Sequence, residues 1–251
     1  MRIFGINRVN NLYNRSVDYR GVEFTKHLLA DLGVNWGIGN AERLKQLPKG
    51  AFITISNHPY GGLDGVMLVD LIAGLRPDYR LMVTDLVYMA EAMQDNFISV
   101  IPRRGNKKPD PMADYRGIKE TLTHLKQGNP IGFFPAGAVS MFHFKSMKVR
   151  DRDWQTGVIK LIQFAKVPVV PIRFFDQNSL FFYFLGVINW RIRLVRMSYE
   201  LFNKNKKPHR IGVGRIILPE ELAELKTLEE LGDYLRKAIY DMPLPITFVP
   251  R

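Results

Sequence analysis

The chain has 251 residues, no cysteine and a formal net charge of +12, from 36 Lys and Arg against 24 Asp and Glu. With 46% hydrophobic residues it can bury a core, which excludes an intrinsically disordered chain. The lack of cysteine excludes a disulfide scaffold, a thiolate nucleophile and a cysteine-ligated metal.

The first part of the chain contains helical patterns followed by a strand. Apolar residues at helical spacing predict an amphipathic helix over residues 17–32 and a short one over 41–47. The apolar run 51–55 predicts a buried strand, which ends in a turn rich in proline and glycine. Asp64 then lies at or beside the start of the next helix. Strand, turn and helix form a first α/β unit.

The alternation continues to the C-terminus, where Pro219 and two glutamates are typical of a helix start. Further strands are predicted over 81–84, 97–101, 131–134, 167–174 and 211–218, and helices over 86–92, 115–126, 156–164 and 219–240. This order predicts an α/β fold with a mostly parallel central sheet flanked by helices. We expect one domain: an N-terminal helical segment (1–47), an α/β core (48–218), and a C-terminal helix and tail (219–251).

The loop after the first predicted strand carries a candidate catalytic pair, His58 and Asp64. Ligands bind at the carboxyl ends of strands in such sheets. A histidine there can take a proton from a hydroxyl or an amine while a carboxylate holds its other ring nitrogen. Gly61 and Gly62 let the loop fold back so that the two side chains can meet. The alternative is that His58 caps the strand and Asp64 merely caps the helix.

Three later strand ends also carry distinctive sequences. Residues 98–105 read ISVIPRRG, and the adjacent Arg103 and Arg104 suit a phosphate or carboxylate. Residues 133–140 read FFPAGAVS, a strand that runs into a Pro-Gly turn. Residues 167–171 read VPVVP.

In order and spacing these motifs resemble the four blocks of the PlsC-type lysophospholipid and glycerol-phosphate acyltransferases. The blocks correspond to residues 57–64, 98–104, 134–140 and 167–171, and the resemblance extends over about residues 36–218. The stretches NHPYGGLDG, FFPAGAVS and NSLFFYFLGVINWRIRLVR are similar to the bacterial hemolysin-like branch, which acylates ornithine or glycine lipids. The resemblance implies a glycerol-phosphate acyltransferase-like fold and an O-acyltransferase.

The resemblance also implies roles for single residues. His58 would be the general base, Asp64 would orient it, and Arg103 or Arg104 would bind an anionic group. Residues 135–140 would line the acceptor site, and two glycines would shape the acyl-donor pocket. The substrate-binding residues implied in this way are Asn57, Gly61, Gly62, Arg103, Arg104, Pro135, Gly137 and Ser140.

Two departures from the family pattern affect these expectations. Five residues separate His58 from Asp64, where the family has four. In the third block Ala136, Ala138 and Val139 replace the family's Glu, Thr and Arg, which are associated with a glycerol-phosphate acceptor. Their loss favours an acylated amino acid or another single-chain lipid as the acceptor.

No thiolate and no Gly-x-Ser-x-Gly elbow is available, so the reaction needs no covalent intermediate. We expect direct transfer from acyl-ACP or acyl-CoA as co-substrate, with no cofactor and no metal. The partners expected are an acyl carrier protein or CoA thioester, a lipid acceptor and an anionic membrane surface. The N-terminus lacks a signal peptide, and no apolar run reaches the ~20 residues of a membrane span. The expected place is therefore peripheral, at the cytoplasmic face of a bacterial inner membrane.

The stretch 174–190 holds seven aromatic residues and is followed directly by a basic run. It is either an interfacial element, with apolar side chains in lipid and cations on head groups, or a core element. Between Met141 and Ile217 lie 15 Lys and Arg but only four acidic residues. A thioesterase, an N-acyltransferase and a catalytically silent basic membrane-binding protein stay open as alternatives. Nucleic acid is not expected, because the aromatics form one apolar run instead of alternating with cations.

Overall fold

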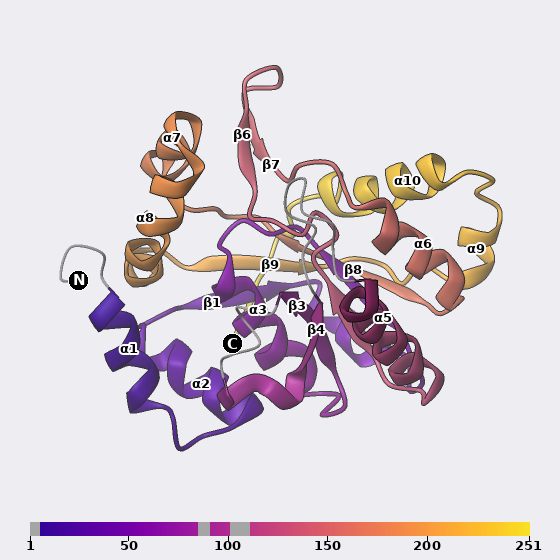
Figure 1. Ribbon diagram of the computed structural model, residues 1–251, viewed down its shortest axis with the longest axis horizontal. Helices are drawn as coiled ribbons and strands as arrows, with labels where there is room; N and C mark the ends of the chain where they lie inside the picture. The colour runs from indigo at the N-terminus through magenta and orange to yellow at the C-terminus, as the bar shows by residue number, and fades with distance from the viewer. Residues whose placement is uncertain (1–5, 85–90, 101–110) are drawn as a thin grey trace.

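A computed structural model describes residues 6–84, 91–100 and 111–251, and its centre is an eight-stranded sheet (Figure 1). The strand order is β10-β1-β9-β8-β2-β5-β3-β4. The strands are β1 (Trp36–Gly39), β2 (Ile53–Ser56), β3 (Arg80–Thr84), β4 (Phe97–Val100), β5 (Ile131–Phe133), β8 (Val169–Phe174), β9 (His209–Val213) and β10 (Val249–Pro250). Only the pairs β1–β10 and β8–β9 are antiparallel, which confirms the mostly parallel sheet that the sequence predicts.

Helices cover both faces of this sheet, each over its own apolar cluster. On one face lie α1 (Ile6–Arg15), α2 (Gly21–Asp31), α3 (Gly62–Leu68) with a π-helical turn (Val69–Ala73), and the 3₁₀ turns Ala41–Gln46 and Glu91–Asn96. On the other lie α5 (Pro111–Lys126), α6 (Thr156–Ala165), α9 (Pro219–Ala223) and α10 (Leu228–Tyr240). The predicted flanking of the sheet by helices is therefore confirmed.

Strand β2 lies at the centre of the sheet, and all four of its residues are buried. It pairs in parallel with β5 on one side and with β8 on the other. Inside the sheet the Thr54 hydroxyl and Tyr79 Oη are 2.6 Å apart, so the buried hydroxyls satisfy each other. The carboxyl end of β2 opens directly into the loop that carries His58, which places this residue at the middle of the sheet edge.

Two hairpins leave this same edge and project from the body side by side (Figure 1). The first is the antiparallel pair β6 (Met141–His143) and β7 (Lys148–Arg150), which follows β5. The second is the helical pair α7 (Leu180–Ile188) and α8 (Trp190–Phe202), which follows β8 and leads through a 3₁₀ turn (Lys204–Lys206) into β9.

Several predicted boundaries differ from the structure. The single helix predicted over 219–240 is two helices, because Thr227 caps a new helix by accepting a hydrogen bond from Glu230 N. The strand predicted over 211–218 ends at Val213, and beyond it Ile217 forms only an isolated bridge to Val169. The helix predicted over 17–32 begins at Gly21, and the one over 41–47 is 3₁₀. Most of the helix predicted over 86–92 lies outside the described residues.

Candidate active site

The loop after β2 brings His58 and Asp64 into contact. Nδ1 of His58 lies 2.9 Å from Oδ2 of Asp64, which is the third residue of α3. The same oxygen accepts hydrogen bonds from Tyr60 N at 2.9 Å and Gly61 N at 3.0 Å. Gly61 has a φ of +86°, a conformation that favours glycine, and this turn aims both N–H groups at the carboxylate. The five residues between His58 and Asp64 are thus folded into a tight turn, and the longer spacing does not separate the pair.

Burial and contacts oppose each other at Asp64. Its side chain is fully buried, and this burial raises the pKa of Asp64. The contact with His58 and the N–H groups of Tyr60 and Gly61 act in the opposite direction and favour the carboxylate. A carboxylate at Nδ1 favours the tautomer with the proton on that nitrogen, which leaves Nε2 as the basic atom.

The ring of His58 lines a cavity of about 500 Å³, a volume typical of small-molecule sites. One wall is the ring of Phe134, stacked on the imidazole with centroids 4.1 Å apart. Most of the remaining lining is apolar and comes from the strands β3, β4 and β5 and from the helices α5 and α6. The apolar lining residues are Met82, Val83, Phe97, Val100, Ile118, Phe133, Val158 and Leu161. Such a cavity suits a long apolar chain whose reactive end lies at His58.

A second buried carboxylate, Asp151, holds the backbone of His58. Its Oδ1 accepts hydrogen bonds from His58 N at 3.2 Å and from the Ser140 hydroxyl, while Ser140 N donates to His58 O at 2.8 Å. Tyr240 Oη in turn accepts a hydrogen bond from Asp151 N at 2.9 Å. Burial raises the pKa of Asp151. Sequence reasoning missed this residue, because nothing near Asp151 in the sequence indicates that it meets a loop 93 residues away.

The other predicted site residues fall into two structural groups. Gly61, Gly62 and Gly137 line the cavity together with His58. Three other predicted substrate-binding residues are not among the described residues that line the cavity, and they form hydrogen bonds within the protein: Asn57, Pro135 and Ser140. The Asn57 amide exchanges two hydrogen bonds with the backbone of Phe174, at 2.8 and 2.9 Å, and the Pro135 carbonyl accepts one from Gln155 N at 2.9 Å. Arg103 and Arg104 lie outside the described residues.

The described part of the chain contains no group of three or more His, Asp or Glu side chains that could hold a metal ion. Over the same residues, none of the helices combines the length and the hydropathy that crossing a bilayer requires.

A family model described as Acyltransferase matches residues 3–244. The chain belongs to the acyltransferase family. A lyso-glycine lipid O-acyltransferase of Bacteroides thetaiotaomicron is 27% identical over 243 residues, which cover 93% of this chain and 85% of that protein. A protein of the same name from Phocaeicola vulgatus is 26% identical over 230 residues, covering 88% of this chain and 78% of the relative.

Among solved structures, the 1-acyl-sn-glycerophosphate (LPA) acyltransferase PlsC from Thermotoga maritima superposes with a TM-score of 0.52 at 14% identity. The match covers 96% of this chain and 89% of that one, and at this identity it shows the fold alone. These findings confirm the resemblance that the sequence motifs indicate: the chain is an acyltransferase with a PlsC-like fold, and it is similar in sequence to two proteins named lyso-glycine lipid O-acyltransferase.

Proposed function

We propose that the enzyme transfers a fatty acyl chain from a thioester to the hydroxyl of a single-chain lipid, with His58 as general base. The observation that carries this proposal is the contact of His58 Nδ1 with the buried Asp64, on a ring that also lines an apolar cavity. A base must lie where the proton is removed and must have a partner that fixes its tautomer. The contact with Asp64 supplies such a partner, and the place of His58 in the lining of the cavity supports the first requirement.

In this mechanism His58 Nε2 removes the proton of the acceptor hydroxyl as its oxygen attacks the thioester carbonyl carbon. The tetrahedral intermediate then collapses, the carbon–sulfur bond breaks, and the imidazolium returns the proton to the leaving thiolate. An ester and a free thiol result, and the enzyme returns to its starting protonation state. Asp64 stabilises the imidazolium between the two steps, and most of the remaining acceleration comes from holding the reactants together.

The cavity beside His58 is the proposed site of the donor's acyl chain. Each buried methylene contributes about 0.8 kcal/mol, so an apolar cavity gives both affinity and selection for chain length. The exposed Arg152 lines the cavity and offers a cation to a phosphate of the thioester carrier. Either acyl carrier protein or CoA satisfies this requirement, and the acidic carrier protein would also be attracted by the basic charge of the enzyme.

As acceptor we propose an acylated amino acid of the lyso-glycine lipid type. The names of the two relatives support this choice. The third block supports it as well, because Ala136, Ala138 and Val139 lack the polar groups associated with a glycerol-phosphate acceptor. We place the reaction at a membrane surface, since both the acceptor and the product are lipids.

The test is to identify the product by mass spectrometry after incubating the purified enzyme with an acyl thioester and competing acceptors. The panel contains lyso-glycine lipid, an N-acylated ornithine, lysophosphatidic acid and glycerol 3-phosphate. A diacylated amino-acid lipid is expected. Free fatty acid as the main product would indicate a thioesterase, and an amide product would indicate an N-acyltransferase.

A further inference from the structure

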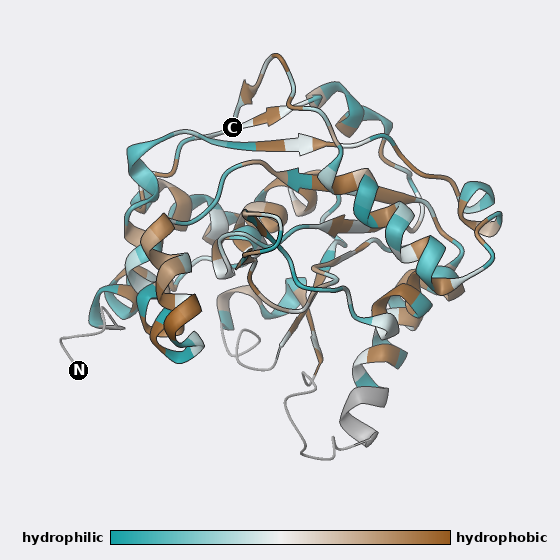
Figure 2. Ribbon diagram, turned by 90° about the horizontal axis from the view of Figure 1, so that it is seen from above, coloured by the Kyte–Doolittle hydropathy of each residue, from teal (hydrophilic) through white to brown (hydrophobic). Residues whose placement is uncertain are grey.

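The two projecting hairpins expose large apolar side chains that a folded protein normally buries. On α7 and at the start of α8, Leu180, Phe184, Ile188 and Trp190 are each more than half exposed. The first three recur every four residues and therefore form a stripe along one side of the helix. On the β6–β7 hairpin Phe144 and Met147 are 64% and 71% exposed. We call these six residues the docking face; Figure 2 shows brown hydrophobic residues on the helical hairpin beside teal hydrophilic ones.

The charge around the docking face has one sign. Residues 141–150 contain Lys145, Lys148 and Arg150, and residues 179–199 contain three arginines, but neither segment has an acidic residue. The Arg191 guanidinium lies 5.5 Å from the centre of the Trp190 ring, so a cation and an aromatic anchor are presented together. Aromatic and aliphatic anchors flanked by cations are the combination that binds an anionic lipid interface.

Both hairpins are fixed to the loop that carries His58. The β6–β7 hairpin begins after Ser140 and ends before Asp151, the two residues that hold both backbone groups of His58. On the helical hairpin, Tyr183 Oη donates to the carbonyl of Pro59 at 3.2 Å. A surface bound by these hairpins is therefore held at a fixed orientation to the catalytic loop.

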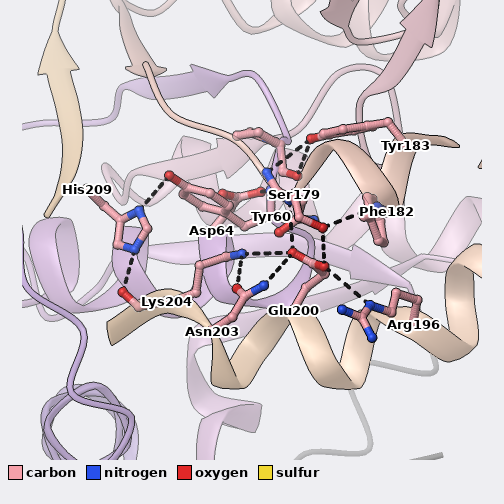
Figure 3. Close-up of polar contacts among 12 residues, drawn as sticks. Tyr60, Asp64, Ser179, Phe182, Tyr183, Arg196, Glu200, Asn203, Lys204 and His209 are labelled. Carbon is pink, nitrogen blue, oxygen red and sulfur yellow. Dashed lines mark hydrogen bonds and ion pairs between the residues drawn. The ribbon is translucent and has the colours of Figure 1, made fainter. Parts of the chain in front are cut away.

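A buried polar network closes the base of the helical hairpin (Figure 3). Glu200 of α8 is almost fully buried and accepts hydrogen bonds from the Ser179 hydroxyl at 2.6 Å and from Ser179 N at 3.0 Å. The buried Lys204 lies 3.4 Å from the same carboxylate, and its backbone carbonyl bonds to His209, which bonds to Tyr60. Buried ion pairs add little net stability, but they specify geometry. The ion pair and these hydrogen bonds together connect the hairpin to Tyr60, two residues after His58.

We propose that the docking face binds the surface of an anionic phospholipid bilayer. This binding would hold the His58 cavity next to the membrane that contains the lipid acceptor. This inference rests on the proposed function, because a lipid acceptor is what makes the orientation useful. The helix α7 has nine residues, which is enough to lie in the interface but not to span it. An acidic carrier protein would pair with the cations but leave the apolar stripe in water. An anionic bilayer can contact both the cations and the apolar side chains, so it fits the docking face better.

Trp190 provides a direct readout of this binding. The other two tryptophans, Trp36 and Trp154, are buried, so a change of emission on adding vesicles reports on Trp190. With vesicles of phosphatidylcholine and phosphatidylglycerol we expect a blue shift and quenching by brominated acyl chains, both weakened by salt. The Trp190→Phe variant should show neither. An unchanged emission spectrum with every vesicle composition would overturn the proposal.

Each of the matched variants replaces one exposed phenylalanine by serine. Phe184→Ser and Phe144→Ser each remove one anchor, and each should weaken flotation with anionic vesicles about tenfold. The control is Phe164→Ser, since Phe164 is 66% exposed on α6 and belongs to neither hairpin. All three variants should keep the melting temperature of the parent. Vesicle binding equal to the parent in both hairpin variants would contradict the inference.

Activity assays separate this inference from the proposed function. With the acceptor presented in vesicles the hairpin variants should lose activity, and with a short-chain acceptor dispersed as monomers they should match the parent. If no acceptor is acylated but vesicle binding still depends on the hairpins, the proposed function fails and the docking face stands. If the variants lose carrier-protein binding or self-association while vesicle binding is unchanged, the docking face is a protein interface and the proposal is wrong.

Discussion

Filling the cavity beside His58 should shorten the acyl chain that the enzyme accepts. Gly62 is the first residue of α3 and lines this cavity, and a Cβ built on it meets no heavy atom of the described residues within 4 Å. The Cβ of a Gly62→Leu side chain therefore has room, and the rest of the side chain would extend from the wall of the cavity. It brings four carbon atoms, which exclude about four methylenes of a long donor chain at about 0.8 kcal/mol each, or about 3 kcal/mol together.

That loss corresponds to a decrease of about 10²-fold in kcat/KM for a donor that fills the cavity. A donor shorter by four carbons should be almost unaffected. The assay is thiol release with a series of acyl thioesters of increasing chain length. The control is Gly50→Leu, because a Cβ at Gly50 also meets no atom within 4 Å in the part of the chain that the structure describes, and Gly50 is not among the residues that line the cavity. If Gly62→Leu lowers kcat/KM equally for all chain lengths, or not at all, the cavity does not hold the acyl chain.

Three further substitutions test the support of the catalytic loop. Asp64→Asn should lower kcat by ~10²- to 10⁴-fold, measured by thiol release, because the imidazolium loses its counter-charge. Burial raises the pKa of Asp64, so the folded state binds the proton of Asp64 more tightly than the unfolded state does. The free energy of unfolding therefore falls as the pH rises above the pKa that Asp64 has in the unfolded state. In urea unfolding at a series of pH values, the Asp64→Asn variant should lack this decrease. Asp151→Ala should lower the free energy of unfolding by about 1–3 kcal/mol in urea, because it leaves the His58 N–H and a buried hydroxyl without their acceptor, and Asp151→Asn should cost less. Gly137→Ala should cost about 1–3 kcal/mol in the same assay, since Gly137 has a φ of +60° and its Cβ would overlap a glutamine side chain, whereas Gly50→Ala should be nearly neutral.

The central strands were predictable because each is a short apolar run between turn residues. β2, β5 and β8 lie in the interior of the sheet, and nearly all of their residues are buried. Such runs predict a strand from the local sequence alone, without information on the strands that pair with it. The edge strand β10 and its neighbour β1 have two and four residues, with a proline in β10 and two glycines in β1, and this composition gives no strand signal. They are strands because of their partners in the sheet.

One helix boundary that was predicted wrongly is marked by a capping signal in the sequence. Thr227 and Glu230 form a capping box, a pattern that can be recognised in the sequence and that starts α10 anew after α9. By contrast α1 has a polar, asparagine-rich sequence, in which Leu12 is buried in the core and helix propensity is low. Its apolar residues Ile6, Val9 and Leu12 nevertheless recur at helical spacing, and Tyr13 packs on Phe24 of α2.

At the site, the contact between His58 and Asp64 was foreseeable because the two residues lie in one loop. Asp151 was not, because its role depends on a hairpin that returns the chain to that loop. The aromatic stretch was open to two interpretations, a core element or an interfacial one, and the structure shows that only part of it belongs to the core: Phe182 and Tyr183 are buried, while Phe181 and Phe184 are more than half exposed. A one-dimensional pattern cannot separate the two sides of a helix that packs on only part of its circumference.

The role of His58 as general base is tested by the rate at which the His58→Ala variant transfers an acyl chain to a lyso-glycine lipid. His27→Ala is the control, because His27 is an exposed histidine on α2, stacked on Tyr19 and outside the cavity. We predict a decrease of ~10²-fold or more for His58→Ala in a protein that is still folded, and no change for the control. Equal rates for His58→Ala and the parent would show that His58 is not the base.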